Sequence, residues 1–421
     1  MKFCHTELPS PRLRPANAPL PLQGLRVIDF SHFIAGPYCA MMLADFGAEV
    51  IKIENGDGGD AFRNYPPLLE GEGVPYLWAN RNKRSLALNL KSSQGRDIAL
   101  GLINTADIVI ENFSTGVMKR LGLDYESLQY KDAIIYCSIS AYGREGPYAH
   151  KTGFDPIVQA ESGFMSMNGL PDQEPLRAGP SVVDVTTALM ACSAILAAVI
   201  ARHHTGKGQY VETTMIGTGI NLLGNFSSAF LATGDNPDRF GNAQPTACPV
   251  GLFHTADEPI YLACANDKTY QCLMTKVLQM PDLATDPRYS SNTLRRENRE
   301  TLLSLIATVL KSRSRSEWLD LMHSSGVPAG AIRTVEQALL SPEVSALDLI
   351  SKVSSDTGGA VPNVALPITL SATPLADPVC APALGAHTDD VLRELLGYDE
   401  KRLQDLRRAG VIGALPMQAN V

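Results

Sequence analysis

The 421-residue sequence has no paired cysteine motif. Its eight cysteines are scattered without CxxC spacing, a pattern that argues against a disulfide framework or a zinc site. We therefore predict reduced thiols in a cytosolic-type compartment and no metal site. No cysteine stands in a recognisable nucleophile context, so a catalytic thiol is not predicted either.

Long runs of basic or of apolar residues are also missing. With 36 basic and 44 acidic residues, the formal net charge is −8, so nucleic-acid binding is not expected. The most apolar segment, 188–201, is short for a membrane span and is typical of a core helix, so no membrane insertion is predicted. No GxGxxG motif follows the first predicted strand, which disfavours a NAD or flavin enzyme.

The N-terminal segment 1–23 is rich in proline and carries Arg12 and Arg14. It lacks the continuous apolar core of a secretory signal, and its prolines disfavour an amphipathic transit helix. We predict an extended arm and a cytoplasmic protein, and an organellar address stays open.

An alternation of strands and helices begins after this arm. Residues 25–30 have the pattern of a buried strand, 36–43 that of a helix, and 50–53 that of the next strand. This order predicts a doubly wound, Rossmann-like parallel sheet whose ligand crevice lies at the carboxyl ends of its strands. The pattern continues with strands at 86–90, 107–111, 133–140 and 210–215 and helices at 93–104, 156–162 and from about 217.

The character of the chain changes after about residue 225, where glycine, asparagine and proline mark a linker. A hairpin and three amphipathic helices follow, the pattern of an α+β domain. A further strand is predicted at 365–370. We therefore predict an arm at 1–23, a large α/β domain formed by 24–225 and 345–421, and a small α+β domain at 236–335. In the small domain the hairpin is predicted at 249–253 and 259–265, and the helices at 269–278, 297–311 and 316–324.

The longest helix pattern runs from Asp184 to His204 and ends at the glycines of 205–208. Asp184 therefore stands where a helix begins. A carboxylate there is either an N-cap, which position alone favours, or an exposed nucleophile surrounded by N–H donors for an oxyanion. The pattern alone leaves both interpretations open.

Several motifs are spread over nearly the whole chain from Gly24: GLRVIDFSHFIAGPYCAMMLADFGAEVIKIE, NKRS, GVPAG and the central helix with its TGKGQ end. Together they resemble the family III CoA-transferases (the CaiB/BaiF family, which includes formyl-CoA transferase and is related to alpha-methylacyl-CoA racemase). This resemblance implies that Asp184 is the catalytic nucleophile. The implied reaction passes through an aspartyl anhydride and an enzyme–CoA thioester, with coenzyme A as substrate and product and no permanently bound cofactor.

The resemblance also implies where CoA is bound. Asn55 departs from the pattern, because relatives carry a basic residue there. Lys83 and Arg84 equally fit a solvated corner. A mobile loop that shields the thioester is implied at Gly241, Asn242 and Gln244, although these residues also suit an ordinary linker. CoA contacts are expected at His32, Phe33, Ile34, Ala35, Arg63, Lys83, Arg84, Asn112, Phe113, Arg120, Asp155 and Met215.

The residue at position 154, a phenylalanine here, distinguishes between the two activities of the related proteins, CoA transfer and racemisation. The racemases carry a histidine at this place, thirty residues before the catalytic aspartate, because an alpha proton is exchanged between two acid/base groups. Phenylalanine cannot exchange a proton, so a CoA-transferase is favoured over an acyl-CoA racemase or epimerase. A non-catalytic CoA-binding protein is the third alternative.

The resemblance further implies an interlocked homodimer, with an acyl-CoA and a carboxylic acid as substrates. We expect succinyl-CoA as the donor and a C4–C5 dicarboxylate as the acceptor. Arg63, Arg177 and His32 are candidates for holding the free carboxylate of such an acid. Backbone N–H groups at the start of the central helix and in the Gly241 loop are expected to support the oxyanion.

Overall fold

The computed structural model describes residues 4–413 and divides the chain into two compact units. The first unit comprises the residues up to Phe164, Ala178–Ser227 and the residues from Pro342 onward. The second unit comprises Met165–Arg177 and Ser228–Ser341. The sequence-based division did not separate Met165–Arg177 from the large domain.

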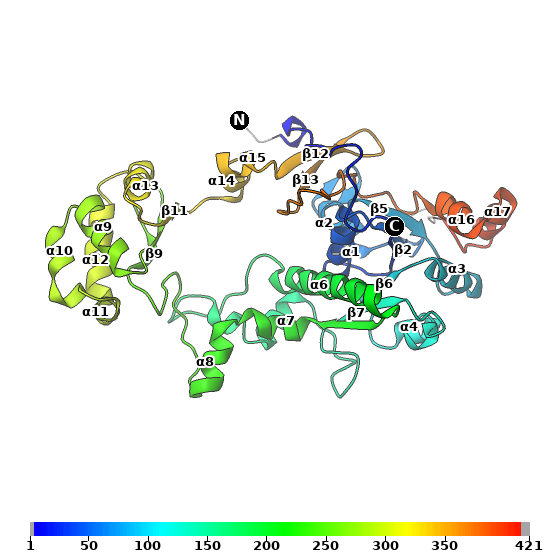
Figure 1. The fold of residues 1–421 in the computed structure, drawn as a ribbon, viewed down its shortest axis with the longest axis horizontal. Helices are drawn as coiled ribbons and strands as arrows, with labels where there is room; N and C mark the ends of the chain where they lie inside the picture. The colour runs from blue at the N-terminus through cyan, green and yellow to red at the C-terminus, as the bar shows by residue number, and fades with distance from the viewer. Residues whose placement is uncertain (1–3, 414–421) are drawn as a thin grey trace, which may run out of the picture. The chain divides into compact units, whose positions relative to one another are not determined.

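The first unit is built on a six-stranded parallel sheet with the strand order β5-β2-β1-β6-β7-β8 (Figure 1). Each strand pairs in parallel with its neighbours, as successive βαβ units require. This confirms the prediction of an α/β protein. The strands are β1 (Arg26–Asp29), β2 (Glu49–Glu54), β5 (Lys83–Ala87), β6 (Ile108–Glu111), β7 (Ile135–Ser140) and β8 (Tyr210–Thr214).

Helices cover both faces of this sheet because successive strand side chains point to opposite faces. Val27 belongs to one apolar core, with α1 (Ala35–Asp45) and α6 (Val182–Thr205). Ile28, the next residue, belongs to the other. The second core is completed by α3 (Ser93–Asn104), α16 (Thr388–Leu396) and α17 (Glu400–Arg408).

The long helix α6 is apolar and long enough to cross a membrane, and within residues 4–413 no other helix is. It packs against α1, β7 and β8, and Ala188, Ala191 and Ile195 are buried in the core that they share. Gly206, with φ of 70°, ends the helix as expected of a left-handed C-cap. We therefore assign α6 to the protein core.

Shorter elements complete the first unit. The strand predicted at 365–370 is wrong: the chain there is irregular after β13, and Pro367 has no N–H for a ladder. The sequence-based prediction also missed the two hairpins. The elements are α2 (Val74–Ala79), α4 (Val117–Leu121), α5 (Asp155–Glu161), α7 (Met215–Leu222), α15 (Pro342–Ala346), and the hairpins β3 (Leu68–Leu69) with β4 (Glu72–Gly73) and β12 (Ile350–Ser354) with β13 (Ala360–Val364).

The second unit has an antiparallel sheet in the order β11-β10-β9, and α8 (Asn225–Thr233) crosses the boundary into it. Its core surrounds the buried Trp318. The helix predicted at 297–311 is divided, because Asn298 is not helical. The elements are β9 (Val250–Phe253), β10 (Ile260–Ala263), β11 (Ala329–Ala331), α9 (Asp267–Cys272), α10 (Pro281–Thr285), α11 (Asn292–Glu297), α12 (Arg299–Leu310), α13 (Arg315–Ser324) and α14 (Val335–Leu339).

Candidate active site

The loops that follow β1 and β6 meet at the carboxyl edge of the six-stranded sheet. The strand order reverses between these strands, which is where open α/β sheets form ligand crevices. The His32 N–H donates to Asn112 Oδ1 at 2.8 Å, and Asn112 Nδ2 donates to the His32 carbonyl at 2.8 Å. The rings of His32 and Phe113 lie 5.2 Å apart. The fold thus brings together three residues predicted to contact CoA, and the contact itself stays a prediction.

A buried charge network fixes the loop after β1. Phe33 has φ of 66°, a left-handed conformation that is rare for a bulky residue. Its N–H donates to Asp60 Oδ1 at 3.3 Å. Lys52 pairs with Asp60 at 3.1 Å and donates to the Ser31 carbonyl at 2.6 Å. Such strain persists only where the surroundings over-determine it, so this network preorganises the loop.

Lys83, one of the predicted CoA contacts, lies buried in the same network. Its ammonium donates to Asp29 Oδ2 at 2.9 Å, to Asn80 Oδ1 at 2.8 Å and to the Pro37 carbonyl at 2.8 Å. Burial lowers the pKa of Lys83 to about 8, so the group stays charged at pH 7. Because an ammonium has three N–H donors, none is left for a phosphate. This geometry gives Lys83 a structural role and does not support its contact with CoA.

Arg63 is also engaged by partners within the protein. Its guanidinium makes a two-bond contact with Glu54 at 2.7 and 2.8 Å, and it also bonds Glu72 at 2.8 Å and the Tyr76 hydroxyl at 2.5 Å. Its side chain is 5% exposed. Both predicted roles of Arg63, the CoA contact and the carboxylate anchor, would require it to leave these partners.

The remaining predicted CoA contacts differ in exposure. Arg84 bridges Glu49 and Glu394 at 2.8 and 2.7 Å. Arg120 is exposed on α4. Ile34 is partly buried at the N-cap of α1, Ala35 is buried in its first turn, and Met215 packs beside α6 in a small apolar cluster.

Arg144 is a residue at this edge that no sequence signal indicated. Its guanidinium donates to Glu111 Oε1 at 2.9 Å, to Ser138 Oγ at 2.7 Å and to the Phe113 carbonyl at 2.5 Å. It therefore holds together the carboxyl ends of β6 and β7 and fixes the backbone beside the His32 ring. In the sequence it is one arginine in a polar loop, with nothing to distinguish it.

Asp184 lies in the first turn of α6 but is not its N-cap. Ser181 holds the N-cap position, so the capping interpretation of Asp184 is wrong. The Asp184 side chain is half-buried, and within residues 4–413 its carboxylate has no hydrogen-bond or ion-pair partner. Burial, and next the charge of Asp155, raise the pKa of Asp184 to about 7. Such a carboxylate is more basic, and hence more nucleophilic, than one held by donors.

Asp155 supplies the missing cap of α6. Its side chain is buried, and its Oδ2 accepts from the N–H groups of Val183 at 2.8 Å and Asp184 at 3.2 Å. Its Oδ1 accepts from Gln159 Nε2 at 2.5 Å. In its own helix α5, Asp155 lies in the first turn, and Phe154 holds the N-cap position. The predicted contact of Asp155 with CoA is untested, and both of its oxygens already have donors.

These bonds also involve the N–H groups expected to support the oxyanion. The first-turn N–H groups of Val183 and Asp184 donate to Asp155, and the Val185 N–H donates to the Ser181 carbonyl at 3.0 Å. Donors that are already satisfied cannot stabilise an oxyanion without losing these partners. This geometry does not support the prediction that the start of α6 supplies the oxyanion donors.

The predicted active-site loop belongs to the second unit. Gly241 has φ of 56°, and its N–H donates to the Gly169 carbonyl at 3.1 Å. The Tyr261 hydroxyl donates to the Asn242 carbonyl at 3.0 Å, and Arg299 donates to the Gln244 carbonyl at 2.7 Å. The role of this loop in the reaction stays a prediction.

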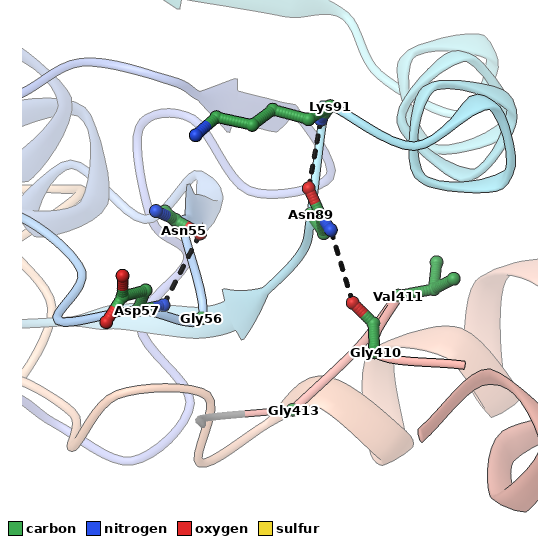
Figure 2. Close-up of a pocket in the computed structure, with 8 residues that line it drawn as sticks. All are labelled: Asn55, Gly56, Asp57, Asn89, Lys91, Gly410, Val411 and Gly413. Carbon is green, nitrogen blue, oxygen red and sulfur yellow. Dashed lines mark hydrogen bonds between the residues drawn. The ribbon is translucent and has the colours of Figure 1, made fainter. Parts of the chain in front are cut away.

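A small polar cavity of about 160 Å³ lies beyond the carboxyl ends of β2 and β5 (Figure 2). Asn55 accepts from the Asp57 N–H at 3.4 Å, and Asn89 accepts from the Lys91 N–H at 3.0 Å. The exposed Lys91 thus brings a positive charge to the cavity that Asn55 lines. Its lining residues are Asn55, Gly56, Asp57, Asn89, Lys91, Gly410, Val411 and Gly413.

Comparison with known proteins identifies the class to which this fold and site belong. The model of CoA-transferase family III matches residues 22–388. The chain therefore belongs to CoA-transferase family III and is an enzyme of that family. This confirms the family that the sequence motifs indicated.

Individual relatives agree with this assignment. The chain is 39% identical over 383 residues to the succinate–glutarate CoA-transferase of Agrobacterium fabrum, and the aligned region covers 89% of this chain and 96% of that protein. It is 33% identical over 394 residues to the succinyl-CoA:glutarate CoA-transferase of Mus musculus, and the aligned region covers 93% of this chain and 90% of that protein. The crystal structure of a CaiB/BaiF family protein from Brucella suis matches with a TM-score of 0.81 and 35% identity, over 90% of this chain and 100% of that one.

Proposed function

We propose that this protein transfers CoA from succinyl-CoA to a C4–C5 dicarboxylate, with Asp184 as the nucleophile. The observation that carries the proposal is the Asp184 carboxylate, half-buried and without a donor of its own in the described chain, with its pKa raised to about 7. Membership of CoA-transferase family III supports the reaction class. The names of two relatives, which pair succinate or succinyl-CoA with glutarate, support the class of acid.

The proposed reaction starts when an Asp184 oxygen attacks the thioester carbonyl of succinyl-CoA. The C–S bond breaks and leaves a mixed anhydride and the CoA thiolate. The thiolate then attacks the Asp184 carboxyl carbon, the bond to the succinyl oxygen breaks, and succinate leaves. The acceptor acid repeats these steps in reverse, so that each covalent step has a moderate barrier and no net proton is transferred.

In this proposal the crevice beside His32, Asn112 and Phe113 takes the CoA moiety. The Gly241 loop excludes water from the thioester, and the active protein is an interlocked homodimer. The preorganised loop after β1 supports the first assignment. Family resemblance supports the other two.

Mass spectrometry of an isosteric pair of variants tests the proposal. With succinyl-CoA, we expect a CoA adduct on the Asp184 peptide that glutarate discharges. Asp184→Asn should lose the adduct and transfer, whereas the control Asp97→Asn, which changes an exposed aspartate of α3, should keep both. A folded, CoA-binding Asp184→Asn enzyme with the full rate would refute the proposal. Deuterium uptake at an alpha carbon without an adduct would instead favour the racemase.

A further inference from the structure

Asp155 and Asp184 form a pair of carboxylates in which one holds the backbone of the other. The Asp184 N–H donates to Asp155 Oδ2 at 3.2 Å, while the Asp184 carboxylate has no donor in the described chain. Gln159 in turn orients Asp155, because its Nε2 donates to Asp155 Oδ1 at 2.5 Å. The Gln159 Oε1 accepts from the Ala178 N–H at 2.8 Å. This second bond fixes the orientation of the Gln159 amide and hence its donation to Asp155.

We propose that Asp155 is a positioning residue that fixes the backbone of Asp184 and, through its negative charge, favours the Asp184–CoA thioester over the free carboxylate. This inference rests on the proposed function, because it concerns the thioester formed at Asp184. A neutral cap such as serine would accept the same N–H groups but would not have the second effect.

The second effect follows from the charge balance of the exchange. Free enzyme plus succinyl-CoA gives enzyme thioester plus succinate, so one negative charge leaves the buried site and enters water as the second carboxylate of succinate. Before the exchange, two like charges lie together where the dielectric constant is low, and their repulsion raises the energy of the free enzyme. After it, Asp155 faces a neutral thioester and the repulsion is gone.

Other acidic groups near α6 are already engaged. The elements packed against α6 include α1, α5, α7, β7 and β8. Asp155 is the residue whose charge adds to burial in raising the pKa of Asp184. The other acids of these elements are Asp45, paired with Arg81 at 2.6 Å, Glu161, paired with Lys151 at 2.5 Å, and Glu212, which accepts from the Arg144 N–H at 2.7 Å.

The double variant Asp155→Asn/Gln159→Glu separates charge from hydrogen bonding. The new asparagine can accept the helix N–H groups through its oxygen and donate its amide to the new glutamate. The glutamate can still accept the Ala178 N–H, so each bond is kept while the charge moves one turn away from Asp184. Glu161→Gln is the matched control, because it removes an exposed charge from the same helix α5.

The measured quantity is the equilibrium ratio of thioester to free enzyme, from intact-protein mass spectrometry at fixed succinyl-CoA and succinate. For the double variant and for Asp155→Asn we expect a fall of about tenfold, the factor that corresponds to one pKa unit. The pH midpoint of thioester formation should also move below 7. A merely structural defect would reduce the competent fraction of enzyme without moving this midpoint.

Three outcomes would decide the matter. A lower ratio and midpoint in the double variant, with Glu161→Gln unchanged, would support the inference. A ratio within twofold of wild type and an unmoved midpoint, with the thioester still formed at Asp184, would overturn the inference and leave the proposed function intact. No thioester at Asp184 in the wild-type enzyme with succinyl-CoA or any other acyl-CoA would overturn both.

Discussion

Replacing Lys83 with methionine would test the buried charge network beneath the loop after β1. The Lys83 and Asp29 side chains are both 0% exposed and pair at 2.9 Å. Removing one partner of a buried ion pair leaves the other charge uncompensated, at a cost of about 3–5 kcal/mol. Lys52 still attracts Asp29. We therefore expect a loss of about 3 kcal/mol, at the lower end of that range.

The assay is urea unfolding, monitored through the fluorescence of Trp78. This residue lies in the first unit and stacks on Tyr38, with the ring centroids 4.8 Å apart. A Trp318→Phe background removes the other tryptophan, which lies in the second unit. Lys119→Met is the matched control. Its ion pair with Glu126 has a similar length, 3.1 Å, but both side chains are 71% exposed, so we expect a much smaller loss of stability than for Lys83→Met.

A double-mutant cycle with Asp29→Asn completes this test. Because the two groups share a buried network, the double variant should be more stable than the sum of the single losses predicts, by about 1 kcal/mol or more. If Lys83→Met lost no more stability than Lys119→Met, the structural role of Lys83 would be refuted. If the variant then also bound CoA more weakly, the contact of Lys83 with CoA that the resemblance implies would be supported.

Three further predictions concern the same edge of the sheet. Gly36→Ala would place a Cβ 2.2 Å from the Ser31 Cβ, so we expect a loss of about 1–3 kcal/mol in thermal unfolding and weaker CoA binding by calorimetry. Arg144→Ala would leave the buried Glu111 carboxylate without its cation, and urea unfolding should show a loss of about 3 kcal/mol, partly restored by Arg144→Lys. Thioester formation should rise with pH through a midpoint near 7 as the Asp184 carboxyl loses its proton, whereas a midpoint near 4 in stopped-flow measurements would contradict the raised pKa.

The opening βαβ unit could be predicted because its signals are local. The strand predicted at 25–30 is β1 (Arg26–Asp29), and the helix predicted at 36–43 is α1 (Ala35–Asp45). Hydrophobic periodicity and flanking glycines determine such elements within a few residues of sequence. The same is true of the central helix, whose start and glycine end give Asp184 its place in the first turn of α6.

The buried charges could not be predicted, because their partners are distant in sequence. Lys83 and its partner Asp29 are separated by 54 residues, and Arg144 and Glu111 by 33. A lysine in a polar corner has the same local pattern whether it faces water, a phosphate or a buried carboxylate. Only the parallel pairing of β1, β2 and β5 brings Lys83 under the loop it supports.

The sequence offered two roles for a carboxylate at the start of α6, helix cap or nucleophile, and the structure divides them between two residues. A side chain that accepts the helix N–H groups is stabilised as an anion and is correspondingly less nucleophilic. Asp155 takes this role from another helix, 29 residues earlier in the chain. The Asp184 carboxylate therefore does not cap the helix, and it accepts no hydrogen bond within the described chain. Because Asp155 also repels the Asp184 anion, the cap that stabilises the helix also destabilises the free form of the proposed nucleophile.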